Sequence, residues 1–345
     1  MLQVLVAIFG ISLLVIVHEA GHYWMARAFG IRVTRFSIGL GPVLAKYQPK
    51  GSPTVFQICA IPFLAYVMIA GMNPAEEVDP NDPELYANKS ILARMLTIVG
   101  GPLANYLAAS LMIFALALSG WREDVPTQPM VVASVEKGSA ADKAGLKPGD
   151  AILEADGKKI SNVKELIAVT SPRAGESTTY VVQRDGKALP PMTIVPRNAG
   201  GRGVIGVTAK YETRVRQLPV GEATALAFTV PWTLTVSNVE GMVDLIKRRS
   251  TEGITGPVGM GKLVAQQAEK GIYPFVGILI AISVALGYFN LLPFPALDGG
   301  KLVFLGYEVI TRRRPNERIE AAVHAVGLLF LLGVIALVTL RDVVG

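Results

Sequence analysis

The chain has 345 residues, of which 51% are hydrophobic and 17% are charged, whereas about a quarter of the residues in an average soluble protein are charged. This deficit of charge excludes disorder, fibrous repeats and an ordinary cytosolic enzyme, and the single cysteine, Cys59, excludes an intramolecular disulfide framework and a cysteine-built zinc knuckle. The net charge of +6 suits nucleic acid or a membrane, and in so apolar a chain we interpret it as Lys and Arg beside a membrane rather than a nucleic-acid face.

The N-terminal segment predicts the first of four membrane-spanning helices. Leu2–Val17 carries no charge and continues helically to about residue 29, which meets the about 20 mostly apolar residues that a span needs. The alternative is a cleaved signal peptide, because Ala26-Arg27-Ala28 imitates a cleavage site. However, the start of the chain has no basic residue, and the apolar run exceeds the upper limit of about 15 residues for a signal-peptide core. We therefore expect a retained helix over residues 2–29.

The second half of this helix contains the run His18-Glu19-Ala20-Gly21-His22. Residues four apart share one face of a helix, so His18 and His22 can present ring nitrogens to one zinc ion, and Glu19 can act as general base. The alternative is two ordinary surface histidines. We favour metal binding, because ionisable groups at membrane depth are expensive and functional by default.

The next segments complete an N-terminal membrane part over residues 1–121. Residues 52–68 are apolar and β-branched and contain Pro62, which predicts a β-hairpin lying against the membrane. The acidic, proline-rich run Asn73–Glu84 predicts a solvated loop. Residues 95–120 carry no charge and predict the second span.

Residues 125–210 predict a small β-rich domain. Met130–Val135 and Thr178–Gln183 are rich in β-branched residues, and the Arg-Asp-Gly-Lys run at 184–187 is a strong hairpin turn. Between them, residues 138–155 read as a short helix with a glycine stop, a Pro-Gly-Asp turn and a strand. This pattern resembles bacterial PDZ domains, in a single copy.

The remainder predicts a linker followed by a C-terminal membrane part. Residues 211–270 are interpreted as the linker, with a membrane-surface helix at about 223–239. The C-terminal membrane part, residues 271–345, contains uncharged spans at about 272–297 and, apart from His324, at 321–340.

A tetrahedral catalytic zinc site needs a third protein ligand, for which Asp298, His324 and Glu308 are the candidates. Asp298 lies where two prolines and two glycines interrupt an apolar segment. An unpaired aspartate there would be protonated or very costly, and zinc resolves both problems. We therefore favour Asp298 over the alternative of an interfacial aspartate that caps the next helix, and we interpret His324 as a polar contact inside the bundle.

Lys and Arg counts predict the orientation of the four spans. The connection between the first two spans and that between the last two are both rich in basic residues, which places both on the cytoplasmic side. Both termini and the PDZ-like domain then lie outside. The basic residues of the two connections are Arg32, Arg35, Lys46, Lys50, Lys89, Arg312, Arg313, Arg314 and Arg318.

Together these motifs resemble the site-2 protease family of intramembrane zinc metalloproteases, within it the bacterial regulator-of-sigma-E protease group. The resemblance rests on the His-Glu-x-x-His run in the first span, the Asn290–Gly300 run with Pro293 and Pro295, and the PDZ-like insert between them. Two further stretches, Gly100–Asn105 and Thr255–Gly259, also match. The chain departs from the family at residues 61–67, where two usual glycines are replaced by Leu64 and Ala65, and in carrying one PDZ-like domain rather than two.

The resemblance implies a polytopic α-helical protein of the bacterial inner membrane, with periplasmic termini and PDZ-like domain and an active site toward the cytoplasm. It implies peptide hydrolysis at zinc held by His18, His22 and Asp298, with Glu19 as general base. The implied substrates are single-pass membrane proteins, such as anti-sigma factors or remnant signal peptides. Membrane lipid is the other expected partner, and the oligomeric state is not predicted.

Four further residues are candidates for substrate binding or oxyanion support: Asn105, Asn290, Pro293 and Pro295. The alternative for the two asparagines is interhelical hydrogen bonding. Because a helical substrate must unwind before cleavage, the stretch Thr54–Ile61 is expected to offer a strand edge to it. The PDZ-like domain is expected to bind a peptide terminus or to exclude bulky substrates.

Two other classes of function stay open from the sequence. One is a catalytically silent PDZ membrane scaffold, which would not need Glu19. The other is a metal transporter, which would need acidic or histidine residues spread over several spans, and the fourth span offers only His324.

Overall fold

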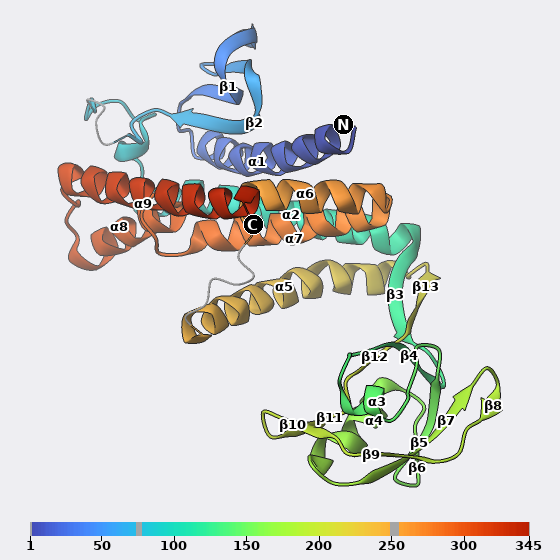
Figure 1. The fold of residues 1–345 in the computed structure, drawn as a ribbon. Helices are drawn as coiled ribbons and strands as arrows, with labels where there is room; N and C mark the ends of the chain where they lie inside the picture. The colour runs from blue at the N-terminus through green and yellow to red at the C-terminus, as the bar shows by residue number, and fades with distance from the viewer. Residues whose placement is uncertain (1, 74–77, 249–254, 345) are drawn as a thin grey trace. The chain divides into compact units, whose positions relative to one another are not determined.

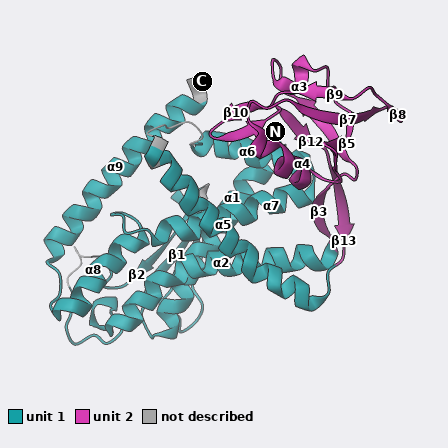
Figure 2. Cartoon of the chain, turned by 90° about the horizontal axis from the view of Figure 1, so that it is seen from below, with its two compact units in different colours: residues 1–119, 218–345 teal, residues 120–217 magenta. Residues whose placement is uncertain are grey.

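The structure is a computed structural model that describes residues 2–73, 78–248 and 255–344. It divides into two compact units, one formed by residues 1–119 together with 218–345 and the other by residues 120–217 (Figure 2). Because the second unit is inserted into the first, the first unit is assembled from both ends of the chain.

The first unit is a helical bundle (Figure 1). Four of its helices are long and apolar enough to cross a membrane: α1 (Leu2–Ala28), α2 (Ile91–Gly120), α7 (Ile272–Leu291) and α9 (Glu317–Val344). The four apolar helices predicted from the sequence are therefore present. The shorter helices are the 3₁₀ turn η1 (Tyr86–Asn88), α6 (Pro257–Glu269) and α8 (Asp298–Thr311).

The segment between the second unit and α7 is more regular than a linker. Helix α5 runs from Val220 to Arg248 with Pro231 inside it, so it is longer than the predicted 223–239. Residues 211–216 form a strand of the second unit, and α6 packs against α1 and α7. The Thr-Gly-Pro run that begins α6 is tied to the last helix, because Asp342 accepts a hydrogen bond from the Gly259 amide at 2.7 Å.

Strands β1 (Val33–Tyr47) and β2 (Val55–Ile69) form a separate sheet of the first unit (Figure 1). Both strands bend, so that Ile38 lies opposite Ala65 on one side and opposite Ile58 on the other. Ile58 in turn lies between Ile38 and Ala45.

This pairing corrects two predictions. The hairpin expected within residues 52–68 is wrong, because residues 55–69 are one strand whose partner is β1. The expected free edge at Thr54–Ile61 is also wrong, because the residues around Ile58 have a neighbouring strand on each side. Alternation along a strand indicates which face is buried but not which segment pairs with it. The loop predicted at Asn73–Glu84 lies partly outside the described residues.

The second unit is built on a seven-stranded sheet with the order β12-β4-β5-β7-β8, in which β6 also pairs with β5 and β9 with β7. Two-stranded ribbons, β10 with β11 and β3 with β13, complete it. The strands are β3 (Trp121–Pro126), β4 (Met130–Val135), β5 (Ala151–Ala155), β6 (Lys158–Lys159), β7 (Thr178–Arg184), β8 (Lys187–Ala188), β9 (Met192–Ile194), β10 (Arg197–Ala199), β11 (Arg202–Val204), β12 (Val207–Ala209) and β13 (Tyr211–Arg216).

Short helices cover this sheet: α3 (Ala140–Lys143), α4 (Val163–Thr170) and the 3₁₀ turn η2 (Ser171–Arg173). The Ser139 side chain begins α3 by accepting a hydrogen bond from the Asp142 amide. The core beneath the helices is apolar and includes the fully buried Tyr180 and Ile152. The unit is therefore a small helix-covered sheet with its own core, as expected for a PDZ-like fold.

One buried ion pair anchors the turn that leads into β5. The Asp150 side chain is fully buried and lies 2.7 Å from the Arg184 guanidinium, and it accepts a hydrogen bond from the Lys147 amide. Burial on its own raises the pKa of the Asp150 carboxyl, but the hydrogen bonds from Arg184 and Lys147 outweigh it and hold the pKa below its ordinary value. The ionised carboxylate is therefore part of the folded structure.

The substitution Asp150→Asn should lower the free energy of unfolding of this unit by on the order of 2 kcal/mol at neutral pH, because hydrogen bonds to a charged group are lost. In the unsubstituted protein the folded-state pKa is below the unfolded value of about 3.9, so this stabilisation is present above that pH and is lost as the pH falls further. Hydrogen exchange of residues 130–209 in the full chain measures both effects. Asp156→Asn is the control, because the ion pair of Asp156 with Arg173 is half exposed and exposed pairs contribute about 1 kcal/mol or less.

Candidate metal centre

Helix α1 presents His18 and His22 on one face, as four-residue spacing requires. Both side chains are buried, each residue being 7% exposed. Their Nε2 atoms are 3.3 Å apart. The two imidazoles therefore converge on one point instead of pointing to solvent.

Asp298 reaches the same point from the start of another helix. Helix α7 ends at Leu291, and the six residues that follow are not helical. This irregular segment contains Pro293 and Pro295, whose rings cannot continue a helix, and Ala296, which has a φ of 76°. Asp298 then begins α8 and is 9% exposed. The break between α7 and α8 thus delivers a carboxylate into the interior of the bundle.

The three ligand atoms fit a zinc ion. Asp298 Oδ2 is 3.2 Å from His18 Nε2 and 3.1 Å from His22 Nε2. Ligand atoms bonded at about 2.0–2.1 Å to a tetrahedral zinc ion are about 3.3 Å apart, and such a catalytic site uses three protein ligands. Among the described residues, His18, His22 and Asp298 form the group of histidine and acidic side chains with ligand spacing.

The tautomer of His22 is set by a backbone carbonyl. His22 Nδ1 is 2.9 Å from the Thr97 carbonyl oxygen, and because a carbonyl can only accept, Nδ1 carries the proton. The Nε2 lone pair is then available to a metal, an arrangement that commonly orients a metal-binding histidine. Lys301 Nζ lies 3.9 Å from the second carboxylate oxygen of Asp298.

Close packing of α1 against α2 makes this contact possible. A Cβ atom on Gly21 would come within 2.1 Å of the Gly100 carbonyl oxygen, and one on Gly101 would come within 2.3 Å of His22 Nε2. Such distances are impossible for real atoms, so a side chain at position 21 would collide with the backbone of α2, and one at position 101 would have to displace the His22 ring. The two glycines bring the helix backbones together and leave the space that the His22 ring occupies.

Glu19 is adjacent to His18 on α1. Its carboxyl is close enough to His18, His22 and Asp298 to interact electrostatically with all three. The structure therefore places an acidic group beside the three ligand side chains.

The other candidate ligands lie elsewhere. His324 Nδ1 accepts a hydrogen bond from the Ala296 amide at 3.0 Å, so it supports the segment that leads to Asp298. Glu308 Oε1 lies 2.6 Å from the Arg94 guanidinium. Neither side chain belongs to the ligand group.

The residues proposed for substrate or oxyanion contact lie in different surroundings. Asn105 is fully buried, and both its side-chain polar atoms lack a hydrogen-bond partner in the described part of the chain. Because Asn105 lies one helical turn after Gly101, it shares the face of α2 that contacts His22. Asn290 instead donates to the Leu286 carbonyl of its own helix, and Pro295 packs against Gly327 of α9.

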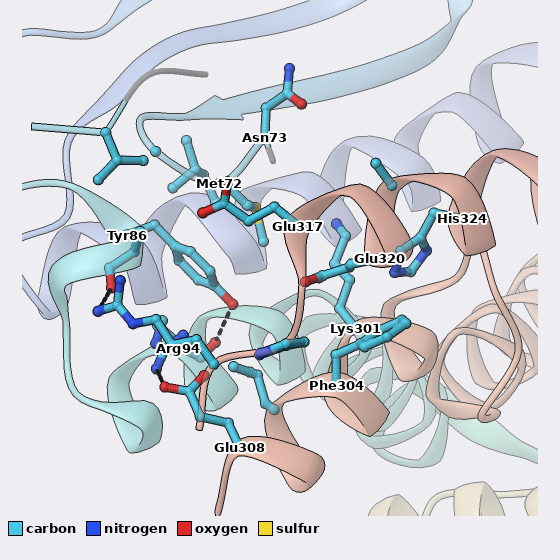
Figure 3. Close-up of a pocket in the computed structure, with 18 of the residues that line it drawn as sticks. Met72, Asn73, Tyr86, Arg94, Lys301, Phe304, Glu308, Glu317, Glu320 and His324 are labelled. Carbon is cyan, nitrogen blue, oxygen red and sulfur yellow. Dashed lines mark hydrogen bonds and ion pairs between the residues drawn. The ribbon is translucent and has the colours of Figure 1, made fainter. Parts of the chain in front are cut away.

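A cavity of about 620 Å³ lies beside the segment that carries Asp298 (Figure 3); Ala296 and Lys301 line it, but His18, His22 and Asp298 do not. It is lined by the end of β2, by the first turn of α2 and by α8 and α9. Lys301 and His324 lie at one side of the cavity, whereas Tyr86, Arg94 and Glu308 lie together at the other side (Figure 3).

Two participants of this centre were not predicted: the Thr97 carbonyl and Lys301. The pairing of Glu308 with Arg94 was not predicted either. A backbone carbonyl has no sequence signature. The adjacent glycines 100 and 101 were a usable signal, because small residues mark close helix packing in membranes.

Comparison with known proteins shows which family the chain matches. Residues 6–334 match the family described as Peptidase family M50. The chain is 33% identical to a protein of Mesorhizobium japonicum assigned as a zinc metalloprotease, over 98% of this chain and 97% of that protein. It is 31% identical to Metalloprotease MmpA of Caulobacter vibrioides, over 94% of this chain and 91% of that protein.

Solved structures also match part of the chain. The PDZ domain of the SdrC-like protein from Listeria monocytogenes is 23% identical, with 25% of this chain and 90% of that domain covered and a TM-score of 0.22.

The substitution Gly101→Ala should lower zinc affinity by about tenfold or more, because the new methyl group must displace the His22 ring, and disturbing the support of a ligand typically costs 10–100-fold. Competition with a chromophoric chelator measures the affinity. Gly277→Ala in α7 is the matched control, since a Cβ there meets nothing within 4 Å. Equal zinc affinity of the two variants would contradict the role of the α1–α2 contact.

Proposed function

Because the chain belongs to peptidase family M50, the site-2 protease family, and is a zinc metalloprotease, we propose that it hydrolyses a peptide bond in or near the transmembrane segment of single-pass membrane proteins. This proposal rests mainly on the position of two ligands inside a helix that is able to span a membrane. His18 and His22 follow a long uncharged run within a helix able to span a membrane. The family assignment favours the protease over the two alternatives, a catalytically silent scaffold and a metal transporter.

The chain's own residues can support hydrolysis at this depth. Zinc held by His18, His22 and Asp298 supplies Lewis acidity when bound, which activates water near neutral pH and polarises a carbonyl. Glu19 accepts the proton of the attacking water and then delivers it to the leaving amine nitrogen. The buried Asn105, whose amide has no partner in the described part of the chain, would support the substrate backbone or the developing oxyanion.

The substrate must present an extended segment, since a helix hides its carbonyls in internal hydrogen bonds. The last part of β2, residues 65–68, pairs with β1 on one side, and no third strand of the described residues pairs with it. Val67 and Met68 line the same cavity as Lys301, whose Nζ lies 3.9 Å from the Asp298 carboxylate. This edge is therefore the place where an unwound substrate would add as a strand beside the metal centre.

We propose the cellular location of the protein and its choice of substrates on the basis of the same family assignment. The chain is a membrane protein, and we place it in the bacterial inner membrane with both termini and the second unit outside and the metal centre toward the cytoplasm. Exposed apolar residues on the β1–β2 sheet, among them Leu44 and Ile58, support an association of this sheet with lipid. The PDZ-like unit would exclude substrates with bulky outer domains, which leaves already trimmed anti-sigma factors or remnant signal peptides.

The substitution Glu19→Gln should retain zinc and lower cleavage of a model transmembrane substrate by about 10²–10⁴-fold, the usual contribution of a general base. Zinc content and cleavage are measured on the same purified protein. Glu269→Gln, at the exposed end of α6, is the control and should cleave normally. Unchanged cleavage by the Glu19 variant would rule out the mechanism.

Single proline substitutions at positions 65–68 test the strand edge. Proline removes one backbone donor, so substitutions at alternate positions, those whose amides point away from β1, should lower cleavage while zinc content stays normal. Full cleavage by all four variants would show that the substrate does not pair with β2.

A further inference from the structure

The position of α8 decides where Asp298 lies, because Asp298 is its first residue. At this end Gly299 is so close to the preceding segment that a Cβ would come within 2.0 Å of a backbone carbonyl oxygen. Beyond the first turn, the buried residues of α8 are Leu305 and Glu308, whereas Ile310 is 84% exposed. The second half of α8 is therefore anchored through one leucine and one carboxylate.

That carboxylate binds the helix that orients His22. Glu308 Oε1 lies 2.6 Å from the guanidinium of Arg94, and both residues are only 7% exposed. Arg94 is in the first turn of α2, three residues before Thr97, whose carbonyl holds His22. The hydroxyl of Tyr86 donates to the Arg94 carbonyl on the same side of the cavity (Figure 3).

Stability alone does not account for this pair. Removing two charges from water is costly, and an apolar pair of similar size often stabilises a protein as well or better. A short ion pair instead favours one position of α8 along α2. Two apolar side chains would allow α8 to slide along α2, because their contact does not depend on direction. Arg94 Nε and Glu308 Oε2 have no hydrogen-bond partner in the described part of the chain, so each charge relies on the other.

We infer that Arg94 and Glu308 are positioning residues of the zinc centre. Their ion pair locks α8 to α2, and so holds Asp298 at the distance from His18 and His22 that one zinc ion requires. Neither residue contacts the ligand atoms; both act through the helices that carry or orient them.

The test compares Glu308→Gln with the double variant Arg94→Met, Glu308→Leu in the full-length protein. Glu308→Gln should weaken zinc binding at least tenfold, in the range found when the support of a metal ligand is removed. The double variant replaces the ion pair by apolar side chains of similar size, so it should unfold near the wild-type temperature and still bind zinc at least tenfold more weakly. Zinc affinity is measured by chelator competition, and the absorption bands of the cobalt-substituted protein report the ligand geometry.

Asp150→Asn is the matched control, since it breaks a buried ion pair in the other unit and should change zinc affinity less than twofold. A folded double variant with wild-type zinc affinity and an unaltered cobalt spectrum would overturn the inference, even if Glu308→Gln fails to fold. Both readouts are taken without substrate. Their outcome therefore does not depend on whether the protein cleaves within the membrane, and a failure of the proposed function would appear instead as absent cleavage by the zinc-loaded wild type.

Discussion

The burial of three metal-binding side chains in an apolar bundle is the constraint on which the rest of the structure depends. A carboxylate and two imidazoles within 3.3 Å of one another are costly away from water unless a partner satisfies them. With its proton on Nδ1, the neutral His22 ring turns the lone pair of Nε2 toward the Asp298 oxygen 3.1 Å away, and no proton lies between these two atoms. A divalent cation accepts both lone pairs and neutralises Asp298, so the geometry of His18, His22 and Asp298 is stable as a metal site and poor as a hydrogen-bonded cluster.

Helix packing supplies that geometry. In a membrane the helices gain little from burying apolar side chains against each other, and small residues let the backbones approach closely instead. Here the absence of side chains at Gly21 and Gly101 has a chemical consequence, because the approach of α2 brings the Thr97 carbonyl to His22 Nδ1. The same contact that joins the two helices therefore sets the protonation of a ligand.

The parts of this centre that could be predicted are those encoded locally. The spacing of His18 and His22 defines one helix face, and the prolines before Asp298 mark a break at membrane depth. The strands of the second unit followed from turn chemistry, as at Asp185-Gly186, where both residues have positive φ. The pairing of β1 with β2 was missed because the residue pattern of a strand indicates its buried face but not the segment that pairs with it. Asn290 shows the same limit, since a polar residue at depth does not reveal that it binds its own helix.

The bundle closes without the second unit. The Leu218 amide donates to the Ala117 carbonyl at 3.1 Å, so the chain leaves the first unit and re-enters it at one place. The antiparallel ribbon of β3 and β13 carries both connections, and the ligands and the Arg94–Glu308 pair all lie in the first unit. Changes in the inserted unit can therefore occur without moving Asp298 relative to the histidines. By contrast, changes along α8 move Asp298. Asp298 and Glu308 lie on this same helix, and Glu308 anchors it to Arg94 of α2.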